Sequence, residues 1–404
     1  MKTKKKNLSK NKSKKIINKG NILSKKEIIK KINKSLKCNF LNLDLDIKKI
    51  GEGVSNYVVS GCLDKHTNNC KNKAAFRIMG ISTHYPNDDS HPVNYEILLY
   101  KLTNKLVDND ITPHIMYLYR SMICKFDDVL GDYDQSITYR ISDEIESDNL
   151  NEKINIMVLE FAELGTINSF VKKKLKKLVQ FKVLFFQVIS MLVTTQYHIP
   201  NFIHGDIHNN NIVIKKDLLG YKLDDLDSGP KKYIRYRIFE KDFYIPFTGF
   251  CAKVFDFDLS RCEQLKNHKM KENFVLINGI TEEYNPVFDY HLFLNSLMYD
   301  KNSEDNPNIP KEIFDFYKEQ IPEEYRGFKN DNLGFARLTN YKNTDDINNT
   351  NLIPKEITTP SDVLLTHPLF DEFREKPKNG KVIKDYNSKI PDESKIKDRK
   401  DMFK

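Results

Sequence analysis

The stretch His204-Gly205-Asp206-Ile207-His208-Asn209-Asn210-Asn211 decides the expected fold more strongly than any other part of the sequence. It follows an apolar run, Gln180 to Tyr197, which we predict to be a buried central helix, and it precedes a short strand, Ile212-Val213-Ile214. An aspartate held in a loop between packed elements can accept a proton from a hydroxyl group, and an asparagine five residues later can turn toward a metal ion. The stretch therefore predicts a polar site, with Asp206 as candidate base and Asn211 as candidate metal ligand.

A second polar element ends an apolar strand downstream, in Val254-Phe255-Asp256-Phe257-Asp258. Asp256 and Asp258 are two residues apart, and such a pair of carboxylates could hold two Mg²⁺ ions. Asp258 could equally cap the turn that follows the strand. Upstream, Ile50-Gly51-Glu52-Gly53-Val54-Ser55-Asn56-Tyr57-Val58 contains two glycines, which let the backbone approach a bound phosphate closely.

In their order along the chain, these elements resemble the glycine-rich loop, the H-x-D-x-x-x-x-N catalytic loop and the D-F-G element of the protein-kinase superfamily. The resemblance implies an α+β, two-lobed protein-kinase-like fold, with a small β-rich N-lobe and a larger α-rich C-lobe. It also implies ATP with Mg²⁺ or Mn²⁺ as cofactors, with Asp206 as the base and Asn211 and Asp256 as metal ligands. Val58 would lie on the adenine.

Shorter matches extend the resemblance over about residues 45–373. Arg77, in Ala74-Ala75-Phe76-Arg77-Ile78, stands where the family has its strand lysine, and Glu96 on the following helix would form an ion pair with it. Met157-Val158-Leu159-Glu160-Phe161-Ala162 resembles the hinge that meets the adenine edge. The residues that the resemblance assigns to the nucleotide are Ile50, Gly51, Glu52, Gly53, Val58, Ala75, Arg77, Glu160 and Ala162.

Two matches lie in the expected C-lobe. Asp289, in Phe288-Asp289-Tyr290-His291, resembles the helix-borne aspartate that braces the catalytic loop, and His367-Pro368-Leu369-Phe370 resembles the helix that closes the larger lobe. Taken together, the sequence is most similar in pattern to the serine/threonine-protein kinases of large DNA viruses.

Several residues depart from the family pattern, among them Asn56 in place of the third glycine of the glycine-rich loop. Arg77 replaces the lysine with a bulkier, planar group, and Lys73 on the same strand face could substitute for it or be a solvated surface residue. Gly205 stands where many kinases have an arginine, so a phosphorylated activation loop would have no such partner to dock on. His208 replaces the catalytic-loop lysine and Asp258 replaces the D-F-G glycine, as in aminoglycoside- and choline-kinase-type enzymes.

The leading interpretation is an ATP-dependent protein kinase that acts on serine and threonine hydroxyls of a protein substrate. His208 and Asp258 favour a small-molecule phosphotransferase as an alternative. Arg77 favours a third interpretation, a nucleotide-binding pseudokinase scaffold. The intact base and metal-binding groups oppose that third interpretation, because a scaffold has no physical need for them. The candidate catalytic residues are Asp206, Arg77, Glu96 and His208, and the candidate metal ligands are Asn211, Asp256 and Asp258.

The patterns divide the 404 residues into four parts. Alternating aromatic and aliphatic residues between the catalytic loop and the D-F-D strand suggest an extra hairpin there. The expected parts are a basic, disordered tail (1–38), an N-lobe (39–161) with an acidic surface loop near 127–153, a C-lobe (162–375) with an insertion near 217–250, and a charged, loose tail (376–404).

The net charge of +9 is unevenly distributed. Residues 1–37 carry fifteen lysines and one glutamate, a local charge of +14, so the remainder carries the difference, −5. The tail could contact nucleic acid or an acidic surface, or be a solvated extension. The longest apolar stretch, Val183 to Val193, is too short to span a membrane, and the six cysteines lack zinc-type spacing. We therefore expect reduced thiols in an intracellular protein.

Overall fold

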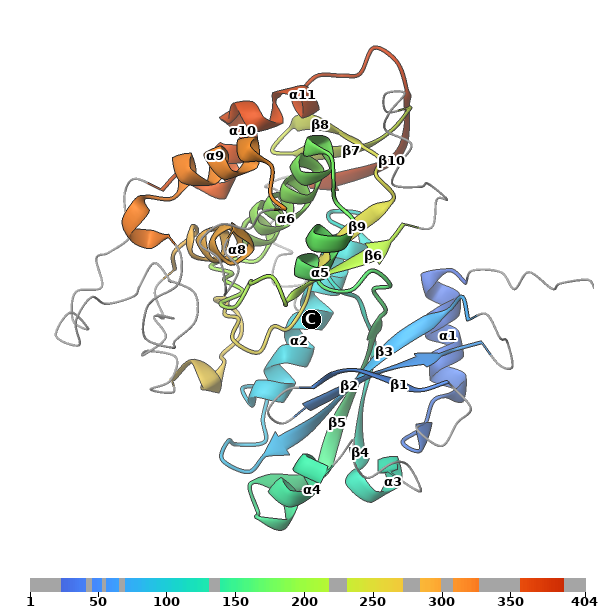
Figure 1. The fold of residues 1–404 in the computed structure, drawn as a ribbon. Helices are drawn as coiled ribbons and strands as arrows, with labels where there is room; N and C mark the ends of the chain where they lie inside the picture. Colours follow the sequence, from blue (N-terminus) through green and yellow to red (C-terminus); the bar gives the residue numbers. More distant parts are fainter. Residues whose placement is uncertain are drawn as a thin grey trace, which may run out of the picture.

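The computed structural model describes residues 23–40, 46–52, 56–64, 70–130, 139–217, 231–271, 284–298, 308–326 and 357–388. These residues form two lobes, a sheet-based lobe from the N-terminal part of the chain and a larger, mainly helical lobe from the remainder (Figure 1). The α+β, two-lobed architecture expected from the sequence is confirmed.

A five-stranded antiparallel sheet with the strand order β1-β2-β3-β5-β4 forms the centre of the N-lobe. Its middle strand β3 is buried along nearly its whole length, because side chains cover both faces of the sheet. The register aligns Val58 of β2 with Arg77 of β3 and Met157 of β5. The strands are β1 (Lys48–Glu52), β2 (Asn56–Cys62), β3 (Lys73–Ser82), β4 (Leu118–Lys125) and β5 (Leu150–Glu160).

Helix α2 (Pro92–Asp108) lies between the lobes and covers the face of the sheet that is directed toward the C-lobe (Figure 1). Its start is well defined, because the His91 side chain accepts a hydrogen bond from the Val93 amide and a proline occupies the first turn. The helix expected to follow the Arg77 strand and to carry Glu96 is therefore present.

The prediction of disorder for the basic tail is wrong for its second half. Helix α1 (Lys25–Ser35) begins at a capping box between Ser24 and Glu27 and presents Ile28, Ile32 and Leu36 to the outer face of the sheet. The Arg120 guanidinium of β4 donates to the carbonyls of Ile32 and Leu36 at the end of this helix. Periodic apolar residues thus outweigh the local excess of lysine. Residues 1–22 lie outside the described part of the chain.

The acidic segment expected as a surface loop also has regular structure. It contains α3 (Phe126–Leu130) and α4 (Tyr139–Glu146), and β5 already begins at Leu150. Val129, Ile141 and Leu150 are buried against the outer face of the sheet, which explains why the segment folds despite its charge.

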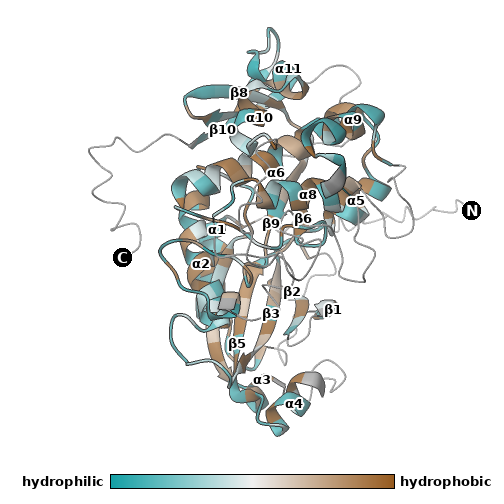
Figure 2. Ribbon diagram, turned by 90° about the vertical axis from the view of Figure 1, so that its left-hand side faces the viewer, coloured by the Kyte–Doolittle hydropathy of each residue, from teal (hydrophilic) through white to brown (hydrophobic). Residues whose placement is uncertain are grey.

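The C-lobe is built around α6 (Leu178–His198), which is buried on nearly all sides, as predicted. Its length and mean hydropathy would suit a membrane span, but 83% of its most apolar window is buried inside the protein, as in the core helix of a globular domain. The hydrophobic colour is prominent on α6 and α8 in Figure 2. Helices α8 (Phe288–Met298), α9 (Lys311–Gln320) and α10 (Pro360–Thr366) pack against α6. Helix α5 (Ile167–Lys173) contacts β6, and α11 (Asp371–Arg374) contacts β8.

Two small sheets complete the C-lobe. Strands β6 (Ile212–Lys216) and β9 (Phe250–Val254) form an antiparallel pair. The loop that contains Asp206 precedes β6, and the D-F-D residues follow β9. The insertion between them folds into the expected extra hairpin, β7 (Lys232–Ile238) and β8 (Lys241–Pro246). The expectation of a loose C-terminal tail is wrong for β10 (Lys381–Ser388), which pairs in parallel with β7.

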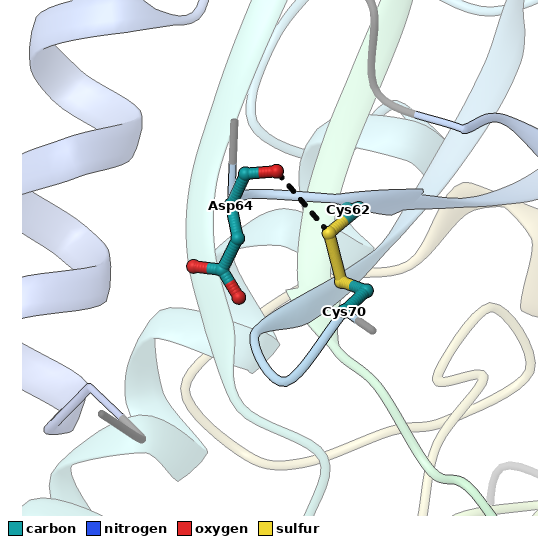
Figure 3. A group of neighbouring side chains, drawn as sticks. All are labelled: Cys62, Asp64 and Cys70. Carbon is teal, nitrogen blue, oxygen red and sulfur yellow. Dashed lines mark hydrogen bonds between the residues drawn. A yellow bond between two sulfur atoms is a disulfide. The ribbon is translucent and has the colours of Figure 1, made fainter. Parts of the chain in front are cut away.

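Four of the six cysteines are joined in disulfides, which corrects the expectation of reduced thiols. Cys38 is bonded to Cys124 and links the segment after α1 to β4, whereas Cys62, the last residue of β2, is bonded to Cys70, which precedes β3 (Figure 3). The Cys62, Cys70 and Asp64 ligand atoms lie within 4.8 Å of one another. Because both sulfurs are in a disulfide, this group offers no thiolate to a metal ion. Cys251 and Cys262 are free thiols.

Candidate active site

The catalytic-loop candidate lies between α6 and β6, at the face of the C-lobe directed toward the sheet of the N-lobe (Figure 1). His204 is fully buried and connects this loop to the strand that carries the D-F-D residues. Its Nε2 atom lies 3.0 Å from the Phe255 carbonyl oxygen, and its Nδ1 atom accepts a hydrogen bond from the Asp206 amide at 3.3 Å. His204 therefore fixes the backbone on both sides of the site.

Asp289 of α8 supports the same loop from beneath. Its two carboxylate oxygens accept hydrogen bonds from the amides of His204, at 2.6 Å, and Gly205, at 2.9 Å. Asp289 is completely buried, and this burial raises the pKa of its carboxyl group, although His204 and the two amide donors act in the opposite direction. Through these two hydrogen bonds Asp289 holds the loop in place, as the resemblance suggested.

The glycine at position 205 is required by close packing. Gly205 has φ +82°, and a Cβ atom placed there would lie 2.3 Å from the Leu259 carbonyl oxygen. An L-residue would therefore be strained in its backbone and would collide with the chain that follows the D-F-D residues. The missing arginine is thus a consequence of how closely these two segments approach.

Three predicted residues of the catalytic loop come together at Asp206. The Asn211 side-chain amide donates to the Asp206 carbonyl oxygen at 2.9 Å and to its Oδ2 atom at 3.1 Å. The Nε2 atom of His208 lies 3.4 Å from the same Oδ2 atom. Asn209 is anchored to Ser296 of α8 by its backbone and side-chain amides. The loop thus holds the Asp206 carboxylate in a defined orientation.

Arg77 joins three elements of the site. Its Nη1 atom lies 2.6 Å from Glu96 Oε1 of α2 and 2.8 Å from Asp256 Oδ1, directly after β9. Burial opposes the charge of Arg77, but the carboxylates of Asp256 and Glu96 outweigh it and raise the pKa of the guanidinium above its ordinary value. Arg77 is therefore the basic residue of β3 that pairs with Glu96, as expected, whereas the Lys73 ammonium lies over the Phe161 ring.

The backbone at Asp256 is held in an uncommon conformation. Asp256 has φ +70°, and its amide donates to the Tyr100 hydroxyl at 3.1 Å. Tyr100 lies one helical turn after Glu96 on α2. Helix α2 is therefore connected to Asp256 in two ways: Glu96 pairs with Arg77, which pairs with Asp256, and Tyr100 contacts Asp256 directly. Sequence reasoning missed Tyr100, although its spacing of four residues from Glu96 could have suggested it.

The second carboxylate, Asp258, has a cation beside it. Lys269 Nζ lies 2.6 Å from Asp258 Oδ2. Burial raises the pKa of the Asp258 carboxyl group, and the nearby Asp256 adds to this effect against the attraction of Lys269. Lys269 was also missed by sequence reasoning, and no local pattern identifies it, because a lysine in a polar loop is most often solvated.

The expected nucleotide side of the site is described in part. Val58 and Ala75 pack with Leu159 in the core that faces the C-lobe, whereas Ile50 is 49% exposed. Gly51 lies at the bulge where β1 meets β2. The side chain of Glu52 and all of Gly53 lie outside the described residues.

At the hinge candidate, the Glu160 side chain takes part in a buried ion cluster. It contacts Lys215 of β6, and Lys253 Nζ of β9 lies 2.9 Å from its Oε2 atom. Burial alone would raise the pKa of Glu160, but Lys253 and Lys215 outweigh it and lower the value to about 2. The Glu160 side chain is therefore engaged in this cluster, and its backbone amide donates to the Tyr117 carbonyl oxygen at 2.9 Å. The contact of Glu160 and Ala162 with a nucleotide stays a prediction.

The donor atoms fit a hard divalent cation. Asn211, Asp256 and Asp258 contribute amide and carboxylate oxygens, the ligands that Mg²⁺ prefers. The Oδ1 atom of Asp256 is buried and accepts no hydrogen bond from the described residues, although Arg77 lies beside it. Both Asn211 amide hydrogens are directed to Asp206, which leaves its Oδ1 atom as the one that can face a cation.

Comparison with known proteins identifies two viral relatives. The chain is 26% identical over 313 residues to "Putative serine/threonine-protein kinase R400" of Acanthamoeba polyphaga mimivirus, and the match covers 72% of this chain and 62% of that protein. It is 24% identical over 216 residues to "Putative serine/threonine-protein kinase R301" of the same virus, covering 50% of each. The matches thus span less than two thirds of either relative. No family model matches the chain. The predicted resemblance to viral kinases is confirmed.

Proposed function

We propose that the chain is an ATP-dependent protein kinase that transfers the γ-phosphate to serine or threonine hydroxyls, with Mg²⁺ or Mn²⁺ as the metal ion. The observation that carries the proposal is the convergence of Asp206, Asn211 and Asp256 with the Arg77–Glu96 pair. The names of the two relatives support the same reaction class and a protein acceptor.

Asp206 would act as the base toward the acceptor hydroxyl. The two hydrogen bonds from Asn211 orient its carboxylate, and Asp289 holds the backbone of the preceding residues. In phosphoryl transfer the protein contributes mainly by positioning groups and stabilising charge, so a rigid carboxylate at the acceptor is the feature the reaction needs.

Asn211 and Asp256 would hold the metal ion, which when bound neutralises charge on the phosphates. Arg77 keeps Asp256 and Glu96 at a fixed separation, so that α2 and the end of β9 move together. The backbone of Gly51 would cover the phosphates, and Val58, Ala75 and the chain at Glu160 and Ala162 would enclose the adenine.

A small-molecule phosphotransferase is the second candidate function. His208 lies 3.4 Å from Asp206, where a protein kinase has a lysine, and Asp258 places a second carboxylate near Asp256. Against this, Lys269 already occupies one oxygen of Asp258. The third candidate, a pseudokinase scaffold, gives no account of why three groups suited to base and metal roles converge.

A phosphoryl-transfer assay with γ-labelled ATP tests the proposal. Wild type and Asp206→Asn are compared with Mg²⁺ or Mn²⁺, and with generic proteins and small alcohols as acceptors. We expect labelled serine or threonine from wild type and a loss of about 10²–10⁴-fold in the variant. Equal labelling by both proteins would contradict an enzymatic function, and labelling of small alcohols alone would favour the second candidate.

A nucleotide thermal shift is the matched binding control. Asp206→Asn should keep the shift that ATP and Mg²⁺ produce in wild type, because Asp206 is proposed to contact the acceptor and not the nucleotide. A shift in both proteins without any transfer would support the scaffold.

A further inference from the structure

The chain that follows the D-F-D residues folds back onto Asp258. Besides the Lys269 ammonium on the Asp258 carboxylate, the Asn267 side-chain amide donates to the backbone carbonyls of Asp258, at 2.8 Å, and of Ser260, at 3.0 Å. Asn267 also accepts a hydrogen bond from the Lys269 amide, which sets the direction of the lysine. Residues 258–269 thus form a closed loop whose two ends are joined by side chains.

The same loop reaches the start of α2. The His268 amide donates to the Ser90 carbonyl oxygen at 3.2 Å, and the His268 ring stacks near Tyr85, with 6.4 Å between ring centroids. Ser90 lies two residues before the first residue of α2, the helix that carries Glu96. Figure 1 shows the short gold helix of this loop beside the N-terminal end of α2. The loop therefore contacts both the residues that follow Asp256 and the start of the helix that carries Glu96, and Asp256 and Glu96 are the two partners of Arg77.

We propose that Lys269 and Asn267 are positioning residues that hold the D-F-D segment and α2 in the arrangement needed for phosphoryl transfer, without a phosphate group on the chain. The inference rests on the proposed function. Asp258 acts in it as the anchor of Lys269 and not as a ligand of a second metal ion. The packing at Gly205 supports this, because no side chain fits there to receive a phosphorylated loop.

The pair acts through geometry more than through stability. The Lys269 and Asp258 side chains are 29% and 27% exposed, so water partly screens their attraction and the pair contributes less to the free energy of unfolding than a fully buried ion pair would. Loss of the pair should therefore loosen the loop locally while the protein stays folded. A merely structural role would instead lower the stability of the whole protein, so the two roles can be distinguished by experiment.

Hydrogen exchange of the nucleotide-free protein tests the inference without any assay of activity. In Lys269→Ala we expect about ten-fold faster exchange or more in the peptides that cover residues 258–271 and 84–96, because the His268 amide loses its partner on Ser90 when the loop opens. Lys269→Arg should restore slow exchange. Lys266→Ala is the matched control, since Lys266 is an exposed lysine of the same loop.

A double-mutant cycle identifies the partner. Asp258→Asn should accelerate exchange in the same peptides, and Asp258→Asn with Lys269→Ala should add nothing further, because both changes remove one interaction. Wild-type exchange in Lys269→Ala would overturn the inference. So would an Asp258→Asn variant with wild-type exchange and a raised half-saturating Mg²⁺ concentration, which is the behaviour of a metal ligand.

Steady-state kinetics of phosphoryl transfer provide a second test of the inference. Lys269→Ala should lower kcat by about ten-fold with the KM for the acceptor unchanged, and Lys269→Arg should recover most of the rate. Phosphatase-treated wild type should keep its rate, and a requirement for phosphate would overturn the inference. If wild type transfers no phosphate at all, the proposed function fails. The exchange experiment still decides whether the pair of Lys269 and Asp258 holds the loop.

Discussion

The Nη1 atom of Arg77 lies 2.6 Å from Oε1 of Glu96, and both side chains are buried. This contact links β3 to α2, and the additional contact with Asp256 links both to the end of β9. Arg77 therefore joins one strand of the N-lobe sheet, the helix between the lobes and the D-F-D residues through ion pairs.

Replacing Arg77 with methionine should leave the buried Glu96 and the partly exposed Asp256 without their shared cation. We expect the free energy of unfolding to fall by about 3–5 kcal/mol, because a buried charge without its partner is strongly unfavourable. Arg77→Lys should lower the free energy of unfolding by less than this, because a cation remains beside the carboxylates. It should not raise the rate of phosphoryl transfer ten-fold or more. Urea unfolding and the transfer assay measure the two effects. A large gain in rate with lysine would show that the natural arginine impairs the site.

Lys73→Met is the matched control for Arg77→Met, because it removes a cation from the same strand. Lys73 contacts the Phe161 ring at 5.5 Å, so its loss should cost only about 0.5–1 kcal/mol.

Gly205→Ala should destabilise the protein by about 3 kcal/mol or more, since the backbone is left-handed there and the new Cβ would meet the Leu259 carbonyl oxygen. Gly51→Ala is the control, because a Cβ at that position would lie 3.6 Å from Val58, an ordinary contact. We expect less than about 1 kcal/mol for it in the same urea titration. Equal stability of Gly205→Ala and wild type would contradict the close packing of the two segments.

The Glu160 cluster predicts an acid-dependent loss of stability. The pKa of Glu160 is lowered to about 2 in the folded protein, against an ordinary value of about 4.3 in the unfolded chain. Its contribution is therefore fully present above about pH 4.3 and is lost as the pH falls toward 2. Urea unfolding between pH 2 and 7 should show a shallower acid dependence in Glu160→Gln than in wild type.

At neutral pH, Glu160→Gln should also lose about 3–5 kcal/mol, because the buried Lys253 loses its carboxylate partner. Glu152→Gln, an exposed change on the same strand, should leave both the stability and its pH dependence as in wild type. An unchanged acid dependence in Glu160→Gln would rule out the cluster as its source.

The disulfides predict a thiol count. Denatured protein should show two reactive thiols without reductant, those of Cys251 and Cys262, and six after reduction. Cys38→Ser should lower the free energy of unfolding by roughly 2–4 kcal/mol, because the bond it removes joins residues 86 apart. Six reactive thiols before reduction would contradict the two disulfides and would support the reduced cysteines that the sequence suggested.

Much of the fold could be predicted because the core elements carry strong local patterns. The catalytic loop, the D-F-D strand, α2, α6 and the extra hairpin all lie where periodicity and residue type placed them. The regular structure of α1 and β10 was not predicted. Both are rich in lysine, and each is stabilised by a partner far away in the chain, the outer face of the sheet for α1 and β7 for β10.

The sequence by itself determined the chemistry that lies within a few residues: Asp206 with Asn211 in one loop, and Asp256 directly after a buried strand. Such groups are brought together by local backbone geometry, so their spacing is sufficient to find them. Only the tertiary structure decided that Arg77 and not Lys73 meets Glu96, and that Lys269 holds Asp258. These pairings depend on how strands, helix and loop pack against one another, which no short stretch of sequence specifies.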